Sequence, residues 1–379
     1  MKRFSLAVLA AFGLMVQGVE AGTTTAALPR MMRPLAMGGA YVGLSDDENA
    51  MFYNPAGLAF SDQKWSFNIT PLMIDTSQKT VEFASWLGTN ASRLGSDFTQ
   101  WKSTDLDKFS SANIRLGYNG NVTLLLPPTA FGFPFAAGAY GVVKNSFKLS
   151  TIGLIPEVII DSNVDVVIPV ALAQQLSLPA LDTFFDEVLG GGKLGVGVTA
   201  KFIQRFSFNE RRSALELSSL DSMTNKITDA IKNPKSGIGF DAGLMYYMKS
   251  LGLSFGLAFQ DIATTIGGDS VPMSMDFGMA FRGGDFSFGP FNEWVFVFDI
   301  DSINDGNVTF FNKIHMGVET NLVGFLKLRG GITQGYPGFG TAFNFVLFRL
   351  DYFTHAVELG RFPGSLEDRQ HTFALSIRL

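Results

Sequence analysis

Segments in which large apolar side chains alternate with small or polar ones recur through the C-terminal half of the chain. They include residues 194–202, 238–246, 251–260, 273–282 and 372–379. Successive side chains of a β-strand point to opposite faces, so each segment would have one apolar face and one face of Gly, Ser, Asp or Lys. A soluble sandwich also alternates, but this repetition with short turns is typical of a membrane barrel. The alternation therefore predicts an all-β fold, a transmembrane antiparallel β-barrel.

The first residues indicate export. Lys2 and Arg3 precede an apolar run at 4–16, and Val19-Glu20-Ala21 offers small residues for cleavage, which predicts a signal peptide at residues 1–21. No later apolar run reaches the roughly 18 residues of a membrane-spanning helix. The chain has no cysteine for disulfides or lipidation, and its net charge of -5 gives no basic excess for nucleic acid. The chain is therefore expected to leave the cytoplasm.

Residues 22–60 precede the first alternating segment and predict a plug inside the barrel. Ser45 and Glu48 have the spacing of a capping box, so a short helix is expected to start at Asp46. Asn54-Pro55 should end it, because the residue before a proline avoids helical angles. The segment is too apolar for an exposed tail and too broken for a membrane span.

This plug resembles a known family. Gly38-Gly39-Ala40-Tyr41, the acidic start at Asp46 and the closing Asn54-Pro55-Ala56-Gly57-Leu58 resemble the hatch of the outer-membrane long-chain fatty-acid transporters (FadL-like). They resemble more closely the shorter PorV-type barrels of secretion systems and related spirochaete barrels. Asp351-Tyr352 and the closing strand from His371 to Leu379 extend the resemblance. It implies a barrel of about 14 strands with an N-terminal plug, located in the bacterial outer membrane.

The remaining residues, 61–379, are expected to form one barrel. In its N-terminal half, Trp65, Phe67 and Ile69 predict a first strand, and alternate residues from Val81 to Leu87 predict a second. Residues 213–232 have helical spacing and predict an insertion between strands. Counting strands back from the C-terminus places this insertion on the periplasmic side, whereas barrels usually keep long connections outside. The side stays open.

Motifs that suggest enzymes lack the structural context that they need. Gly252-Leu253-Ser254-Phe255-Gly256 has the spacing of a nucleophile elbow but lies in an alternating strand, as does the loose dinucleotide pattern at 195–200. The three histidines, His315, His355 and His371, are scattered. We therefore predict no catalytic residue, no metal site and no cofactor. A Ser-His-Asp site in a barrel is the remaining enzymatic alternative.

Charges at the parity of the small residues are nearly balanced, whereas an ion-selective pore tends to carry rings of one sign. The balance favours cross-strand pairs that brace a narrow, filled barrel. The basic residues are Lys201, Arg205, Arg282, Lys313, Lys327, Arg329 and Arg349, and the acidic ones are Asp241, Asp276, Glu293, Asp299, Glu319 and Asp351.

Some strands are apolar at both parities, so apolar surface is expected to face inward. Residues 164–172 and 343–352 are the examples. One interpretation is packing against the plug; the other is a path for a hydrophobic, fatty-acid-like ligand beside it, as the resemblance implies. The two are compatible. The candidate ligand-binding residues are Met51, Phe52 and Leu58 of the plug and Phe343, Phe345 and Leu347 of the wall.

Two places are candidates for a gate. Asn54, Pro55, Ala56 and Gly57 would hold the plug at its exit toward the first strand. Pro127-Pro128 is either a turn or a kinked strand that opens the wall, because proline cannot donate to a strand ladder.

The function implied by the resemblance is passive uptake of hydrophobic molecules past the plug; the alternative is capture of exported proteins at the cell surface. Expected partners are a hydrophobic small molecule or lipid, the outer-membrane lipids and, in the alternative, exported proteins. Phe373, Leu375 and Ile377 of the last strand offer an insertion signal to the barrel assembly machinery, although the chain ends in Leu379 rather than Phe.

Overall fold

A computed structural model describes residues 31–61, 65–94, 113–150, 157–177, 191–213, 228–284, 286–358 and 366–379, with a few single positions between them. The expected signal peptide and the first residues of the expected plug lie outside these ranges. Among the residues that the structure describes, no helix is both long enough and apolar enough to cross a membrane.

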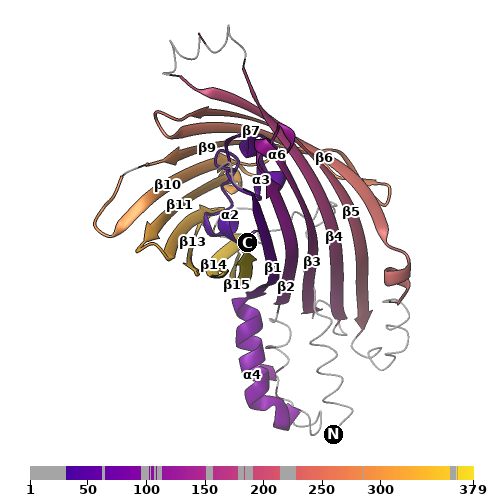
Figure 1. Cartoon of the computed structure of the whole chain (residues 1–379). Coiled ribbons are helices and arrows are strands. Elements are labelled where there is room, and N and C mark those ends of the chain that lie inside the picture. Colours follow the sequence, from indigo (N-terminus) through magenta and orange to yellow (C-terminus); the bar gives the residue numbers. More distant parts are fainter. Residues whose placement is uncertain are drawn as a thin grey trace.

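The strands form one closed antiparallel barrel (Figure 1). The sheet contains fifteen strands, of which β8 (Asp269–Ser270) pairs with the end of β7 alone, so fourteen make the wall. Pairing of β1 with β15 and of β6 with β7 completes the ring. The wall strands are β1 (Ser66–Ser77), β2 (Asn113–Leu126), β3 (Phe135–Ser150), β4 (Glu157–Leu176), β5 (Lys193–Ser213), β6 (Lys235–Met248), β7 (Leu253–Ile266), β9 (Ser274–Arg282), β10 (Phe291–Ile300), β11 (Ile314–Leu322), β12 (Leu326–Thr333), β13 (Tyr336–Asn344), β14 (Phe348–Glu358) and β15 (Glu367–Arg378).

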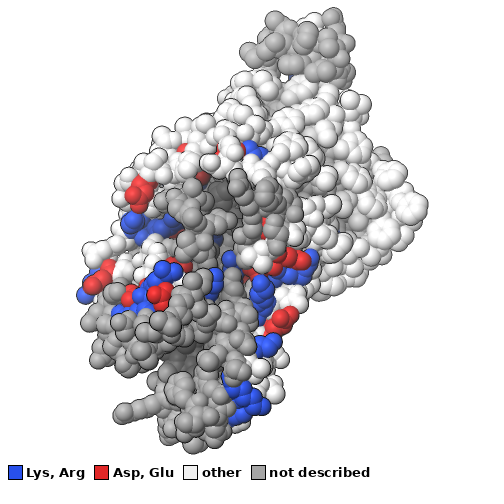
Figure 2. All heavy atoms as spheres, turned by 180° about the vertical axis from the view of Figure 1, so that it is seen from behind, with Lys and Arg blue, Asp and Glu red and all other residues white. Residues whose placement is uncertain are grey.

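The predicted alternation is confirmed. Val198 and Phe202 of β5 are exposed on the outside, whereas Thr199 and Lys201 between them are buried toward the lumen. Figure 2 shows a broad area without Lys, Arg, Asp or Glu at the right, the side on which β9–β13 lie. Large apolar side chains on the outside and small or polar ones inside are the arrangement of a barrel that faces lipid.

The two ends of the barrel differ. We call the rim where Leu379 pairs with Phe67 the C-terminal end and the opposite rim the loop end. The helix α4 (Gln78–Leu94) follows β1 and therefore lies at the loop end. Strands β3, β4 and β5 have 16, 20 and 21 residues, whereas β11, β12 and β13 have 9, 8 and 9. The wall is thus much taller on one side than on the other.

The strand predicted from Val81 to Leu87 is wrong, because these residues belong to α4. Phe83, Trp86 and Leu87 pack with Ile114 of β2. These three follow helical spacing, which brings them to one face of a helix. An alternating pattern of residues 81, 83, 85 and 87 omits Trp86, which the helix brings to the same face as Phe83 and Leu87.

The described part of the predicted insertion, residues 228–232, is helical and lies at the loop end, between β5 and β6. Residues 214–227 lie outside the described ranges. Counting strands back from the C-terminus instead predicts the end at which the last strand finishes, the C-terminal end. A count that takes residues 343–352 as a single strand loses one crossing, because the structure has a turn between β13 and β14 there.

Candidate functional site

Residues 31–61, the described part of the segment expected to form the plug, lie in the lumen (Figure 1). The described part contains α2 (Met32–Ala36), α3 (Ala50–Tyr53) and the 3-10 helix η1 (Pro55–Phe60). Met37, Tyr41, Leu44, Met51 and Leu58 are fully buried between plug and wall. The plug is therefore a packed part of the molecule.

The helix predicted to start at Asp46 instead starts at Ala50, with Asn49 before it. Ser45 does not act as a cap, since its hydroxyl donates to the carbonyl of Tyr41. Asp46 and Asp47 bind Arg33 at 2.6 and 2.9 Å. A tertiary ion pair thus replaces the local capping that the sequence suggested. The predicted end at Asn54-Pro55 is confirmed, because Asn54 is extended and follows the last residue of α3.

A row of wall glycines lets the plug backbone lie directly on the wall. A Cβ atom at any of them would overlap backbone or side-chain atoms of plug residues 37–56. Glycine is therefore required by close approach rather than by conformation. We call this row the glycine belt: Gly197 of β5, Gly243 of β6, Gly256 of β7, Gly278 of β9, Gly317 of β11 and Gly331 of β12.

Polar side chains of the same strands hold the plug backbone. The carboxylate of Asp299, fully buried in β10, accepts hydrogen bonds from the backbone N–H groups of Val42, at 2.7 Å, and of Tyr41. Ser254 of β7 donates to the carbonyl of Gly43 at 2.6 Å. The sequence placed Asp299 and Ser254 in the lumen, and the structure shows them as anchors of the plug.

Asn54, predicted to hold the plug, joins three segments. Its amide nitrogen donates to the carbonyls of Val42 and of Leu244 in β6, both at 3.0 Å. Its amide oxygen accepts the N–H of Ala56 at 3.1 Å, at the start of η1. Pro55, Ala56 and Gly57 are buried in η1, which packs against β4, β5 and β6.

Charged side chains connect the plug to the opposite part of the wall. Arg33 of α2 binds Glu319 of β11 at 3.0 Å in addition to Asp46 and Asp47. Arg329 of β12 pairs with Glu319 and, at 3.1 Å, with Asp351 of β14. The predicted cross-strand pairs are thereby confirmed.

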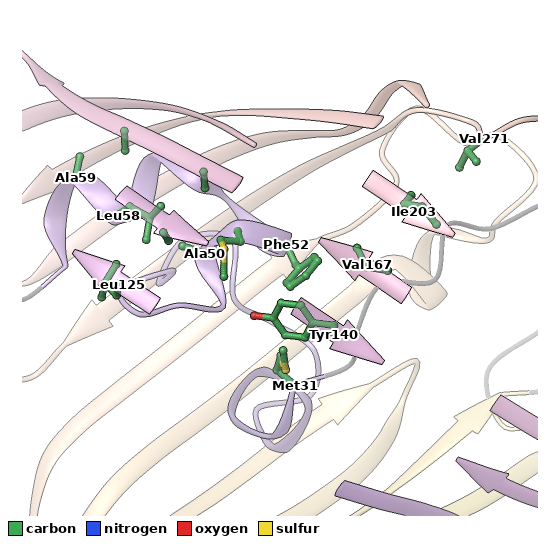
Figure 3. Close-up of a cluster of buried hydrophobic side chains, with 14 of the residues drawn as sticks. Met31, Ala50, Phe52, Leu58, Ala59, Leu125, Tyr140, Val167, Ile203 and Val271 are labelled. Atoms are coloured by element: carbon green, nitrogen blue, oxygen red, sulfur yellow. The ribbon is translucent and has the colours of Figure 1, made fainter. Parts of the chain in front are cut away.

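Around Phe52 the contact of the plug with β2–β5 is apolar, whereas at η1 Gln175 of β4 donates a hydrogen bond to the carbonyl of Ala59 at 2.8 Å. Phe52 packs edge-on against Tyr140, with 4.8 Å between the ring centroids, and Met31 lies on the other side of the tyrosine ring (Figure 3). We call this contact the apolar seam. It consists of Met31 and Phe52 of the plug with Leu125 of β2, Tyr140 of β3, Val167 of β4 and Ile203 of β5. Val167 thus faces inward, with packing against the plug.

The six candidate ligand-binding residues do not form one site. Met51, Phe52 and Leu58 are buried at the plug, whereas Phe343 is exposed on the outside of β13. Phe345 and Leu347 lie in the exposed turn between β13 and β14. The wall half of the prediction is therefore wrong, because this turn restarts the alternation.

Pro127 and Pro128 do not open the wall. They begin a turn that contains the short helix α6 (Pro128–Phe131), and β2 pairs with β3 without interruption from Asn113–Lys148 to Leu126–Phe135. The wall is irregular elsewhere, including β1, where register shifts against β2 and against β15 flank Pro71. Proline lacks the N–H that a ladder needs, but its surroundings in the sequence did not suggest a bulge.

The nucleophile-elbow pattern and the dinucleotide pattern both lack the strand-to-helix turn that their chemistry requires. Ser254 lies within β7 and residues 195–200 lie within β5, without a helix at either place. In the part of the chain that the structure describes, no group of three His, Cys, Asp or Glu residues has the arrangement of a metal site.

Comparison with solved structures identifies the architecture. A TodX monoaromatic hydrocarbon channel lacking S2 aligns over 92% of this chain and 97% of its own, with TM-score 0.54 and 12% identity. The TodX variant lacking S2 and S3 aligns over 92% and 98%, with TM-score 0.54 and 11% identity. This chain has the fold of those hydrocarbon channels.

The Pseudomonas putida toluene transporter TodX also aligns, over 94% of this chain and 99% of its own, with TM-score 0.49 and 11% identity. No protein-family model matches the sequence, and no curated protein matches it. The expected fold, a barrel of about 14 strands with an internal plug, is confirmed.

Proposed function

We propose that this chain is an outer-membrane barrel through which small hydrophobic, fatty-acid-like molecules pass passively, with the N-terminal plug as the gate. It would be exported by its signal peptide and inserted by the barrel assembly machinery through β15. It would use no cofactor and perform no chemistry. The similarity of the fold to that of the TodX monoaromatic hydrocarbon channels supports a hydrophobic cargo.

The observation that carries the proposal is the asymmetry of the plug's contacts. Toward β7–β12 the plug is fixed by Asp299, by Ser254, by the belt glycines of β7, β9, β11 and β12, and by the Arg33–Glu319 ion pair. At the apolar seam, Phe52 and Tyr140 meet through nonpolar contact. Nonpolar contact is less directional than hydrogen bonding, so this is the side at which an apolar molecule can replace plug contacts with its own.

The test compares Val167→Asn with Val297→Asn. Both valines are buried at 1% and 5% exposure and face the plug, but Val167 lies in the seam and Val297 of β10 lies on the fixed side. A polar group in the seam disfavours a desolvated hydrocarbon. In proteoliposomes, Val167→Asn should lower uptake of radiolabelled oleate and toluene several-fold, and Val297→Asn should not. The ratio of the two cargoes would measure fatty-acid preference.

Equal uptake by vesicles that contain the barrel and by protein-free vesicles would contradict passage through the barrel. Equal loss in both variants would contradict the seam as the path. Each variant must first show the heat-modifiable migration of a folded barrel, so that a folding defect is not counted as a transport defect.

The alternative is a PorV-type barrel that captures exported proteins at the surface. It is supported by the loop end, where α4 is held by apolar packing and β3–β5 are long. A photo-crosslinking residue at Val81, which is exposed on α4, should then capture an exported protein in intact cells. Such a crosslink, together with no uptake above that of protein-free vesicles, would favour capture over transport.

A further inference from the structure

The turns at the C-terminal end are unusually apolar. Each of the five turns described there carries an exposed large apolar side chain: Phe131, Leu251, Phe288, Phe325 and Val346. Val346 is 97% exposed and Phe288 71%. Lys249 and Asp285 are the charged residues in the sequence of these turns. We call this ring the apolar rim. Turns that face water in a barrel are normally polar, so the rim requires an explanation.

The short strands on one side of the barrel explain why its turns are apolar. A barrel strand rises about 3.3 Å per residue and tilts by about 40°, so the 8 residues of β12 cover about 20 Å along the membrane normal. The apolar band of such barrels is about 25 Å tall. Strand β12 is too short for it, and its outward residues are apolar or Gly from Leu326 to Ile332. The band must therefore continue beyond the strand.

The turns on either side of β12 show in which direction the apolar band continues. The turn to β13, at the loop end, is Gln334-Gly335, whereas the turn from β11, at the C-terminal end, is Val323-Gly324-Phe325. Val323 and Phe325 are both exposed in this turn, which directly precedes Leu326, the first outward residue of β12. The lipid-facing surface is thus continuous with the rim on this side.

We propose that the apolar rim is submerged in the bilayer, so that the turns around β9–β14 contact phospholipid at the C-terminal end of the barrel. The partner is lipid, because the rim continues the lipid-facing wall and completes its height. Lys249 fits this position, since a lysine at the membrane boundary extends its ammonium to the headgroups. The proposal rests on the placement in a membrane but not on the cargo.

The absence of cysteine allows a direct test with single spin labels. Labels would be placed at Val346→Cys and Phe288→Cys in the rim. Controls are Asn307→Cys in the exposed loop between β10 and β11, and Phe296→Cys on the outward face of β10. In phospholipid vesicles, collision of each label with oxygen and with a water-soluble nickel chelate reports its depth.

We expect nickel collision rates at 346 and 288 several-fold below that at 307, with oxygen rates close to that at 296. Rim labels as accessible to nickel as the label at 307 would overturn the proposal. Rim labels shielded from both reagents would overturn it too, because they would indicate a protein contact. The label at 296 shows independently whether the barrel is embedded, and uptake is measured separately.

Discussion

Single polar residues in this barrel act on backbone groups that lie far away in sequence. Asp299 accepts two plug N–H groups, and Asn54 joins two carbonyls and one N–H. An unsatisfied buried N–H costs about 1–3 kcal/mol, so such residues fix the plug more strongly than an equal number of surface contacts.

Asp299→Ala should therefore loosen the plug without dissolving the barrel. Two buried N–H groups would lose their acceptor, at a cost of about 1–3 kcal/mol each. Hydrogen exchange at residues 41 and 42 should accelerate while the strand amides stay protected. Asp269→Ala is the control, because Asp269 and its ion-pair partner Lys235 are both exposed. Exchange that rises equally in both variants would contradict the anchoring role.

At the scale of elements, the plug and the wall are fitted backbone to backbone. Neighbouring glycines of β12 differ sharply in this respect. A Cβ at Gly331 would overlap Gly38 and Met37 of the plug, whereas the nearest atom to a Cβ at Gly330 is 3.6 Å away. The inward face of the strand is tightly occupied and its outward face is open.

We expect Gly331→Ala to displace the plug and Gly330→Ala to leave it in place. Because the overlapping atoms at Gly331 belong to backbone, a rotamer change cannot relieve the contact. Protease cleavage between residues 37 and 49 should rise several-fold in Gly331→Ala alone. Equal cleavage in both variants would show that the glycine belt does not position the plug.

The helix α4 has its own electrostatic tie at the loop end. Arg93 binds Asp105 at 2.6 Å, and the hydrogen bond from Arg93, followed by that from the N–H of Lys102, lowers the pKa of Asp105 to about 2. A depressed carboxyl pKa contributes stability above the unfolded value near 4, and this contribution disappears as the pH falls toward 2.

The order around Arg93 should thus be constant from pH 8 to 5 and decrease below pH 4. Hydrogen exchange at residues 90–94 would measure it. Asp105→Asn should exchange faster at neutral pH and lose the pH dependence in the acid range. A change centred near pH 6 would point to another group.

For the whole molecule, we expect membrane assembly to depend on the outward row of the last strand. Phe373 is exposed on β15, which pairs with β1 to close the ring. Phe373→Asp places a charge on the lipid face at a cost of up to about 2–4 kcal/mol and should reduce the heat-modifiable form in outer-membrane fractions. Phe373→Leu should assemble normally. Normal assembly of the aspartate variant would contradict the orientation.

Much of the wall follows from sequence because alternation and burial depend on local pattern. The prediction from this pattern is wrong where a turn lacks the usual turn residues. The turn at 345–347 contains Phe, Val and Leu instead of turn residues, so it resembled a strand. The anchors of the plug were also beyond reach, since Arg33 and Glu319 are 286 positions apart and meet through the register of β11. Their charges were visible in the sequence, but their partners were not.

A wall whose glycines meet the plug on six strands also restricts the order of assembly. The first and last strands, β1 and β15, pair to close the barrel. A curved sheet of β5–β12 can therefore receive the plug before β1 and β15 have paired. After closure, the plug would have to slide past glycines that leave no space for a methyl group. We expect a barrel refolded without residues 22–60 to reject the plug peptide added later, and to bind it when both refold together. The plug would then serve the barrel as a template.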